Sequence, residues 1–122
     1  MSERESNLAV DVTIRDAGTA VLSLGGELDM ETAPLLEGSL GEQLRDGRAH
    51  VVLDLTGLEF MDSSGLNVLI RAVHKARGVG GDVYLAAPTS AVRRILEITG
   101  VTTTIPPHSG VAEALAAAGG AR

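Results

Sequence analysis

The chain has 122 residues, of which 44% are apolar, carries a formal net charge of −6 at pH 7 and contains no cysteine. This length suits a single domain with one core, and the missing cysteines exclude disulfides and thiolate metal sites. The ten lysines and arginines are scattered along the chain, which argues against nucleic acid as a partner because nucleic acid requires a concentrated positive face.

No segment approaches the roughly 20 consecutive apolar residues that a membrane-spanning helix requires. The N-terminal sequence MSERESN is charged and lacks the apolar stretch of a secretory signal peptide. We therefore expect a cytoplasmic protein without a membrane partner. We also expect one domain over residues 1–122, with residues 1–7 and 118–122 flexible.

The first predicted elements form a pair of strands. Apolar residues alternate with others over residues 8–14, and a second apolar strand covers residues 20–24, which is the pattern of half-buried strands. The turn sequence DAG between them predicts an antiparallel pair. The glycine pair at residues 25–26 is expected to end the second strand.

A helix follows, and Pro34 fixes where it can begin. A proline several residues inside a helix removes a hydrogen bond and clashes with the preceding turn. Thr32 is therefore a better N-terminal cap than Asp29, because it places Pro34 in the first turn. Gly47 is the expected stop. The apolar positions recur at helical spacing: Leu36, Leu40 and Leu44.

The middle of the chain predicts a buried strand followed by the clearest helix. Residues 50–55, HVVLDL, are almost continuously apolar, which is typical of a central strand covered on both faces. The helix is expected over residues 64–77 and ends at the glycines beyond. Its buried side has the i, i+3, i+4, i+7 spacing of an amphipathic helix: Leu66, Leu69, Ile70 and Val73.

The remaining elements are a strand at residues 83–86, a helix from Thr89 to a stop at Gly100, a last short strand at residues 102–105 and an alanine-rich helix at residues 109–117. Strands that alternate with helices after an opening hairpin indicate an α/β fold. The predicted architecture is a mixed sheet of about five strands with an antiparallel edge, together with about four helices.

The sequence FMDSSGL, at residues 60–66, lies where the central strand leads into the clearest helix. Its simplest interpretation is a helix cap, since Asp62, Ser63 and Ser64 are all of preferred capping types. A cap requires only one side chain, however, and here three polar ones stand in a row. Gly65 is also unusual, because alanine would favour the helix, whereas glycine allows another molecule to approach the backbone closely.

Two chemical interpretations of this sequence are weak. A hydrolase nucleophile of the G-x-S-x-G type would require glycine where Met61 stands, and a triad would need a histidine beside the serine. A nucleotide phosphate could bind N–H groups at the helix start, but the G-x-x-x-x-G-K-[ST] motif is absent and Asp62 would repel the phosphate. We therefore expect no catalytic residue, no metal and no cofactor.

A further interpretation is that one of the serines is phosphorylated. A phosphoryl group adds a charge of about −1.5 to −2 and three acceptor oxygens, and at a helix start we expect it to meet free N–H groups and the positive end of the helix dipole. A partner surface that accepts the uncharged serine would instead meet a dianion beside Asp62. Such a modification can end binding without unfolding the domain.

The segment VVLDLTGLEFMDSSGLNVLIRAVHKARGVGG resembles the signature of STAS-domain anti-sigma factor antagonists, and GGELDMETAPLL resembles that family's first strand-to-helix junction. The likeness runs from about residue 8 to residue 117. It implies a non-enzymatic regulator with a STAS-type mixed sheet and helices mainly on one side. In this family the unphosphorylated antagonist binds an anti-sigma factor, itself a GHKL-type serine kinase, and frees the sigma factor. The kinase inactivates the antagonist by phosphorylating a serine of DSSG, and a PP2C-type phosphatase restores it.

The resemblance also implies roles for individual residues. The family's phosphorylated serine is the second of the motif, which corresponds to Ser64, with its neighbour Ser63 as the second choice. Asp29 and Asp62 match the acids of the two motifs, on loops that resemble the family's partner-binding surface. The partner-binding residues expected from this comparison are Asp29, Met30, Asp62, Ser63, Gly65 and Asn67.

Structural explanations remain open for several of these residues. Asp29 either contacts a partner or only bonds nearby backbone N–H groups, and Met30 and Met61 are either exposed contacts or buried. The outer face of the helix that carries Asn67 either meets a partner or is solvated. The rival function is a STAS interaction module that is never phosphorylated and acts as a scaffold in a signalling complex. A serine hydrolase, a different class, would need a histidine near Ser64.

Overall fold

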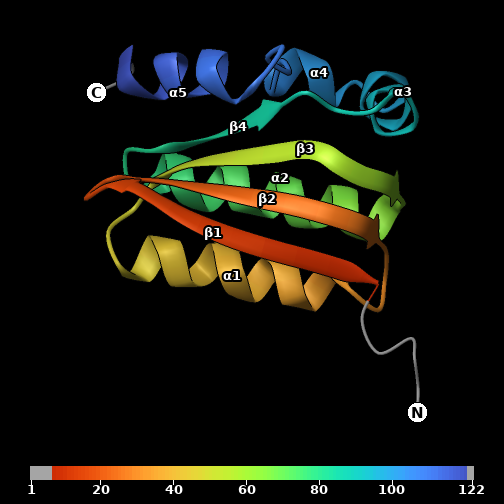
Figure 1. The fold of residues 1–122 in the computed structure, drawn as a ribbon, viewed down its shortest axis with the longest axis horizontal. Helices are drawn as coiled ribbons and strands as arrows, with labels where there is room; N and C mark the ends of the chain where they lie inside the picture. The colour runs from red at the N-terminus through yellow and green to blue at the C-terminus, as the bar shows by residue number, and fades with distance from the viewer. Residues whose placement is uncertain (1–6, 121–122) are drawn as a thin grey trace.

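The computed structural model describes residues 7–120 (Figure 1). Residues 1–6 and 121–122, which include most of the ends predicted to be flexible, lie outside the described residues. Within the described part of the chain, the strands form one mixed sheet in the order β1-β2-β3-β4, with β1 antiparallel to β2 and the other pairs parallel. The strands are β1 Leu8–Asp16, β2 Thr19–Leu28, β3 His50–Met61 and β4 Asp82–Ala86.

β2 and β3, which pair with each other in parallel, both extend further than the sequence predicted. Gly25 and Gly26 were expected to end the second strand, but β2 continues to Leu28 and pairs with a similarly lengthened β3. The glycines fall where the register shifts, and Gly26 has a φ of +100°. A Cβ on Gly57 of β3 would lie 3.0 Å from the Leu24 carbonyl oxygen. These glycines therefore accommodate a bulged, close pairing of the two strands rather than ending one of them.

The helices confirm most of the predicted pattern, with one correction. The helices are α1 Ala33–Arg45, α2 Ser63–Gly78, α3 Ser90–Ile98, α4 Val101–Thr104 and α5 Val111–Gly120. The short strand predicted at residues 102–105 is wrong, because this segment forms the single turn α4. Gly100 reverses the chain with a φ of +80°, and the N–H of Ile105 donates to the Val101 carbonyl oxygen at 2.8 Å. Val101 and Ile105 are both buried, and a spacing of four residues brings them to the same side of a turn.

The core has two layers of unequal size, one on each face of the sheet. The larger layer contains buried side chains of α1, α2, α3 and α4, packed against alternate residues of the strands. The smaller layer lies between the sheet and α5, on the side opposite α1 (Figure 1). Leu53 of β3 faces the larger layer and Val52 the smaller one, which confirms β3 as a central strand covered on both faces. Helices mainly on one side are likewise confirmed.

The described helices are short or polar. None of those within residues 7–120 is both long enough and apolar enough to cross a membrane. The N-terminal part of α1 agrees with the prediction: Thr32 precedes the helix and Pro34 lies in its first turn. Thr32 occupies the cap position but makes no side-chain capping bond, because its hydroxyl turns back and donates to the Glu27 carbonyl oxygen at 2.9 Å.

Candidate functional site

The DSSG motif lies at the C-terminal end of β3, where this strand leads into α2. β3 ends at Met61, and α2 begins directly after Asp62. Leu28, the last residue of β2, pairs with Met61, and its carbonyl oxygen accepts a hydrogen bond from the N–H of Asp62 at 3.2 Å. The loop after β2, which carries Asp29 and Met30, therefore leaves the sheet beside the motif. The structure brings together the two segments to which the family resemblance assigns partner binding.

Asp62 is the N-terminal cap of α2. Its backbone is extended, and its Oδ1 accepts hydrogen bonds from the N–H of Ser64 at 2.9 Å and the N–H of Gly65 at 3.3 Å. Its carbonyl oxygen accepts the first helical hydrogen bond, from the N–H of Leu66 at 3.1 Å. Of the three polar residues that could have capped the helix, the aspartate does so. The side chains of Ser63 and Ser64 are not used for capping.

This cap corrects the expectation that a phosphate on Ser64 would meet free N–H groups. Two of the N–H groups at the helix start, those of Ser64 and Gly65, are bound to the Asp62 carboxylate. A dianion on Ser64 would therefore share the first turn with an existing negative charge, although the helix dipole still favours anions there. Phosphorylation would concentrate negative charge at this end of α2.

The capping role of Asp62 can be tested by thermal unfolding. Asp62→Ala is expected to destabilise the domain by about 1 kcal/mol, the usual loss for an N-terminal cap, and so to lower Tm by a few degrees. Asp62→Ser keeps a capping oxygen without the charge and should recover most of that loss. Circular dichroism measures both transitions. If the serine variant were as unstable as the alanine variant, the hydrogen-bonding role would be contradicted.

Gly65 is required by packing inside the domain. The residue is buried, and a Cβ at this position would lie 2.6 Å from Cγ of Leu28 and 2.9 Å from Cγ of Met61. Both neighbours are themselves buried, so neither can swing into solvent to make room. The close approach that the sequence suggested is thus made by β2 and β3 of the same chain, and this contact explains the glycine without a partner.

The two serines differ in exposure. Ser63 is exposed and Ser64 is half-buried. Within residues 7–120 neither side chain takes part in a hydrogen bond, so no hydrogen bond of the described fold must break before either hydroxyl reacts. Asn67, one turn further along α2, is also exposed. Both serines therefore remain candidates for modification on geometric grounds, and the choice of Ser64 rests on the family resemblance.

Asp29 has a structural role in the neighbouring loop. Its Oδ1 accepts hydrogen bonds from the N–H of Glu31 at 3.0 Å and the N–H of Thr32 at 3.1 Å. Its own N–H donates to the Thr32 hydroxyl at 2.9 Å. These bonds hold the turn between β2 and α1 in shape. The structural explanation left open for Asp29 is confirmed, and a contact between its half-buried carboxylate and a partner stays a prediction.

The two methionines of the site have opposite environments. Met30 is 74% exposed, whereas Met61 is buried and contributes to the larger core layer. Phe60, which directly precedes Met61, is 47% exposed. Sequence reasoning did not select Phe60, because a phenylalanine in a strand ordinarily predicts burial and nothing in the local pattern signals the contrary. Met30 and Phe60 are apolar side chains near the motif that a partner could cover.

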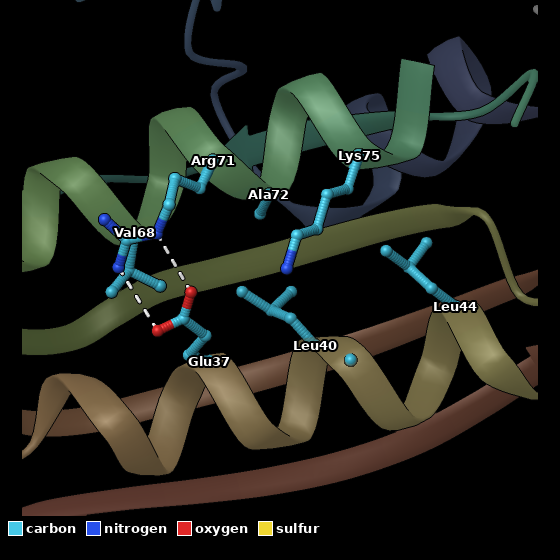
Figure 2. A pocket seen from close by; sticks show the side chains of 8 residues that line it. Glu37, Leu40, Leu44, Val68, Arg71, Ala72 and Lys75 are labelled. Atoms are coloured by element: carbon cyan, nitrogen blue, oxygen red, sulfur yellow. Dashed lines mark hydrogen bonds and ion pairs between the residues drawn. The ribbon is translucent and has the colours of Figure 1, made fainter. Parts of the chain in front are cut away.

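An ion pair between Arg71 of α2 and Glu37 of α1 links the two helices (Figure 2). Arg71 donates from Nε to Glu37 Oε2 at 2.9 Å and from Nη2 to Oε1 at 3.2 Å. This bidentate bond lowers the pKa of Glu37 below its ordinary value and raises that of Arg71. The groove between the helices has a free volume of about 20 Å³, room for roughly one water molecule. Arg71 is thus engaged in an ion pair within the chain.

The histidines are not arranged as a serine hydrolase requires. His50 lies at the start of β3, at the opposite end of the strand from the motif, and its Nδ1 is 2.8 Å from the Tyr84 hydroxyl. His74 follows Ser64 by ten positions, a rise of about 15 Å along α2. His108 contacts the ring of Tyr84, on the α5 side of the sheet. None of them hydrogen-bonds to Ser64 in the part of the chain that is described.

These features define a small α/β domain with a mixed sheet and an exposed serine-containing helix start. Residues 10–114 match the family described as STAS domain. The chain belongs to this family.

Relatives of known name support the assignment. The chain is 36% identical over 115 residues to the anti-sigma-F factor antagonist RsfB of Mycobacterium tuberculosis, with 93% of each chain covered. Its fold is similar to the crystal structure of an anti-sigma factor antagonist from Mycobacterium paratuberculosis, with a TM-score of 0.83, 34% identity and coverage of 97% and 98%. The unphosphorylated form of the antagonist SpoIIAA has the same fold, with a TM-score of 0.77, 23% identity and coverage of 88% and 93%.

Proposed function

We propose that this chain is a cytoplasmic anti-sigma factor antagonist. Unphosphorylated, it binds an anti-sigma factor that has GHKL-type serine kinase activity, and this binding releases a sigma factor. The same kinase then phosphorylates Ser64 and ends the binding, and a PP2C-type phosphatase restores it. The chain itself performs no catalysis. The residues proposed to contact the partner are Asp29, Met30, Asp62, Ser63 and Asn67, whereas Gly65 is buried and is explained by packing within the domain.

One observation carries the proposal: Ser64 is half-buried in the first turn of α2, two residues after the capping Asp62, in a chain 36% identical to an anti-sigma-F factor antagonist. Its hydroxyl has no hydrogen bond to any residue in 7–120, so phosphorylation would break no hydrogen bond of that part of the chain. The exposed Met30 beside the motif offers a partner apolar area. Flexible methionine side chains adapt readily to such surfaces.

The switching step follows from charge. An uncharged Ser64 can be covered by a partner, whereas a phosphate brings about −1.5 to −2 charges next to the Asp62 carboxylate. Leaving such charge unpaired in an interface costs several kcal/mol, and about 1.4 kcal/mol corresponds to a tenfold change in affinity. Phosphorylation is therefore expected to weaken binding by about a hundredfold or more while the α1–α2 core stays folded.

Incubation with a GHKL-type anti-sigma factor and ATP, followed by intact-mass spectrometry, tests the proposal. We expect the wild-type chain to gain one phosphoryl group, Ser63→Ala to gain one as well, and Ser64→Ala to gain none. Full phosphorylation of Ser64→Ala together with loss of phosphorylation in Ser63→Ala would move the site to Ser63. If the wild-type chain bound the anti-sigma factor but were never modified, the scaffold function would replace the switch.

A further inference from the structure

β2 and β3 continue together past the part of the sheet that α5 covers. The strand residues of the smaller core layer, which lies between the sheet and α5, are Val21, Val52, Tyr84 and Ala86. Beyond them, residues 25–28 of β2 still pair with residues 57–61 of β3. This paired end, here called the sheet extension, leads directly into the loop after β2 and into the DSSG motif.

Phe60 lies on the face of the sheet extension that points away from α2. Successive strand residues alternate between the two faces of a sheet, and Met61 belongs to the larger core layer, which contains α2. Phe60 therefore points to the opposite face, as does Glu27, its partner in the parallel pairing. Phe60 is 47% exposed. An aromatic ring that is half open to solvent gains free energy when another surface covers it.

Two carboxylates lie beside this ring. Glu59 precedes Phe60 and is exposed, and Glu27 is half-buried. Neither glutamate forms an ion pair with another residue in 7–120, whereas Glu37 of α1 is paired with Arg71. A surface that covers the ring must supply positive groups, because an unpaired charge weakens an interface. A second copy of the chain, docked by the same patch around a two-fold axis, would instead bring glutamates against glutamates.

We propose that Phe60 is the apolar anchor of the contact with the anti-sigma factor, which receives the ring in an apolar pocket edged by lysine or arginine side chains. This inference rests on the proposed function and adds a residue and a second face to its contact surface. Phe60 and Asp62 are two positions apart, about 7 Å along the chain, so one partner can cover both. The ring points away from α2, so the anchor is separate from Ser64.

Surface plasmon resonance of the full chain with a GHKL-type anti-sigma factor tests the anchor. Phe60→Thr removes the ring but keeps a residue that favours strands. It is expected to weaken binding by roughly tenfold or more, mainly through faster dissociation. Val79→Ser is the matched control, because Val79 is also an exposed apolar side chain but follows the far end of α2. This control should bind like the wild type.

The charged rim is tested by the rate of association. Glu59→Lys places a positive charge beside Phe60 and should slow association and reduce its dependence on salt, because rim charges act mainly on this rate. Glu42→Lys changes the net charge of the chain by the same amount at an exposed position of α1. It should have a clearly smaller effect on both quantities.

The outcomes separate this inference from the proposed function. A wild-type chain that does not bind the anti-sigma factor contradicts both. If the wild type binds and Phe60→Thr binds equally tightly, only the inference is overturned. It is also overturned if Val79→Ser loses as much affinity as Phe60→Thr, or if sedimentation velocity shows that the ring instead joins two copies of the free chain.

Circular dichroism checks that each variant folds, as expected from the exposure of Phe60 and Glu59. If Phe60→Thr does not fold, Glu59→Lys decides, because the wild-type ring is still present in that variant. An association rate and a salt dependence equal to those of Glu42→Lys would then overturn the inference.

Discussion

Ser64→Ala is expected to bind the anti-sigma factor and to stay bound in the presence of ATP, whereas Ser64→Asp is expected to bind at least tenfold more weakly than the wild type. Alanine removes the hydroxyl that accepts the phosphoryl group, so the kinase cannot end the interaction. Aspartate places a permanent charge beside the Asp62 carboxylate, and an unpaired charge in an interface costs several kcal/mol. Surface plasmon resonance with and without ATP measures both effects.

Two further variants separate charge from shape in this experiment. Ser64→Asn has nearly the size of Ser64→Asp without its charge, and should bind much closer to the wild-type affinity. Ser63→Asp adds a charge at a proposed contact position that is exposed in the free domain, and should also weaken binding, because the partner would cover this charge. Equal weakening by Ser64→Asn and Ser64→Asp would show that the partner excludes bulk rather than charge. The electrostatic account of the switch would then be wrong.

The fold could be predicted where local physics leaves little choice. Pro34 allows only a narrow choice of helix start, and α1 indeed places it in the first turn. The apolar spacing in α2 predicted residues 64–77, and the helix runs one residue further at each end. A short, nearly continuous apolar run such as residues 50–55 is typical of a strand that is covered on both faces. In each case the decisive signal lies within one element.

Predictions failed where the answer depends on another element. The last six residues of β3 contain exposed polar positions and look like a loop until the extended β2 pairs with them. Residues 102–105 favour a strand locally, whereas the structure forms the turn α4 there. The buried pair Val101 and Ile105 favours a turn only once both are known to face the core. For the same reason, the sequence indicated three possible capping residues. It could not show that the Asp62 carboxylate is the one that accepts hydrogen bonds from the N–H groups of Ser64 and Gly65.

The need for glycine at position 65 also depends on other elements of the fold, namely β2 and β3. Its substitution is the second change for which we expect a large effect. Gly65→Ala is expected to destabilise the domain by about 1–3 kcal/mol, the usual range for overpacking a filled core, and to lower Tm by several degrees. The added methyl would collide with Leu28 and Met61, which are both buried. Relief requires α2 to move away from β2, so the cap and Ser64 would move with it.

Gly38→Ala is the matched control, because it makes the same chemical change in the interior of α1. A Cβ on Gly38 would meet no atom within 4 Å, so the substitution should stabilise the domain by about 0.5–1 kcal/mol through helix propensity alone. Thermal unfolding of the two variants should therefore shift Tm in opposite directions. If Gly65→Ala were as stable as Gly38→Ala, the packing explanation would fail, and the glycine would again point to a partner that approaches the backbone at the start of α2.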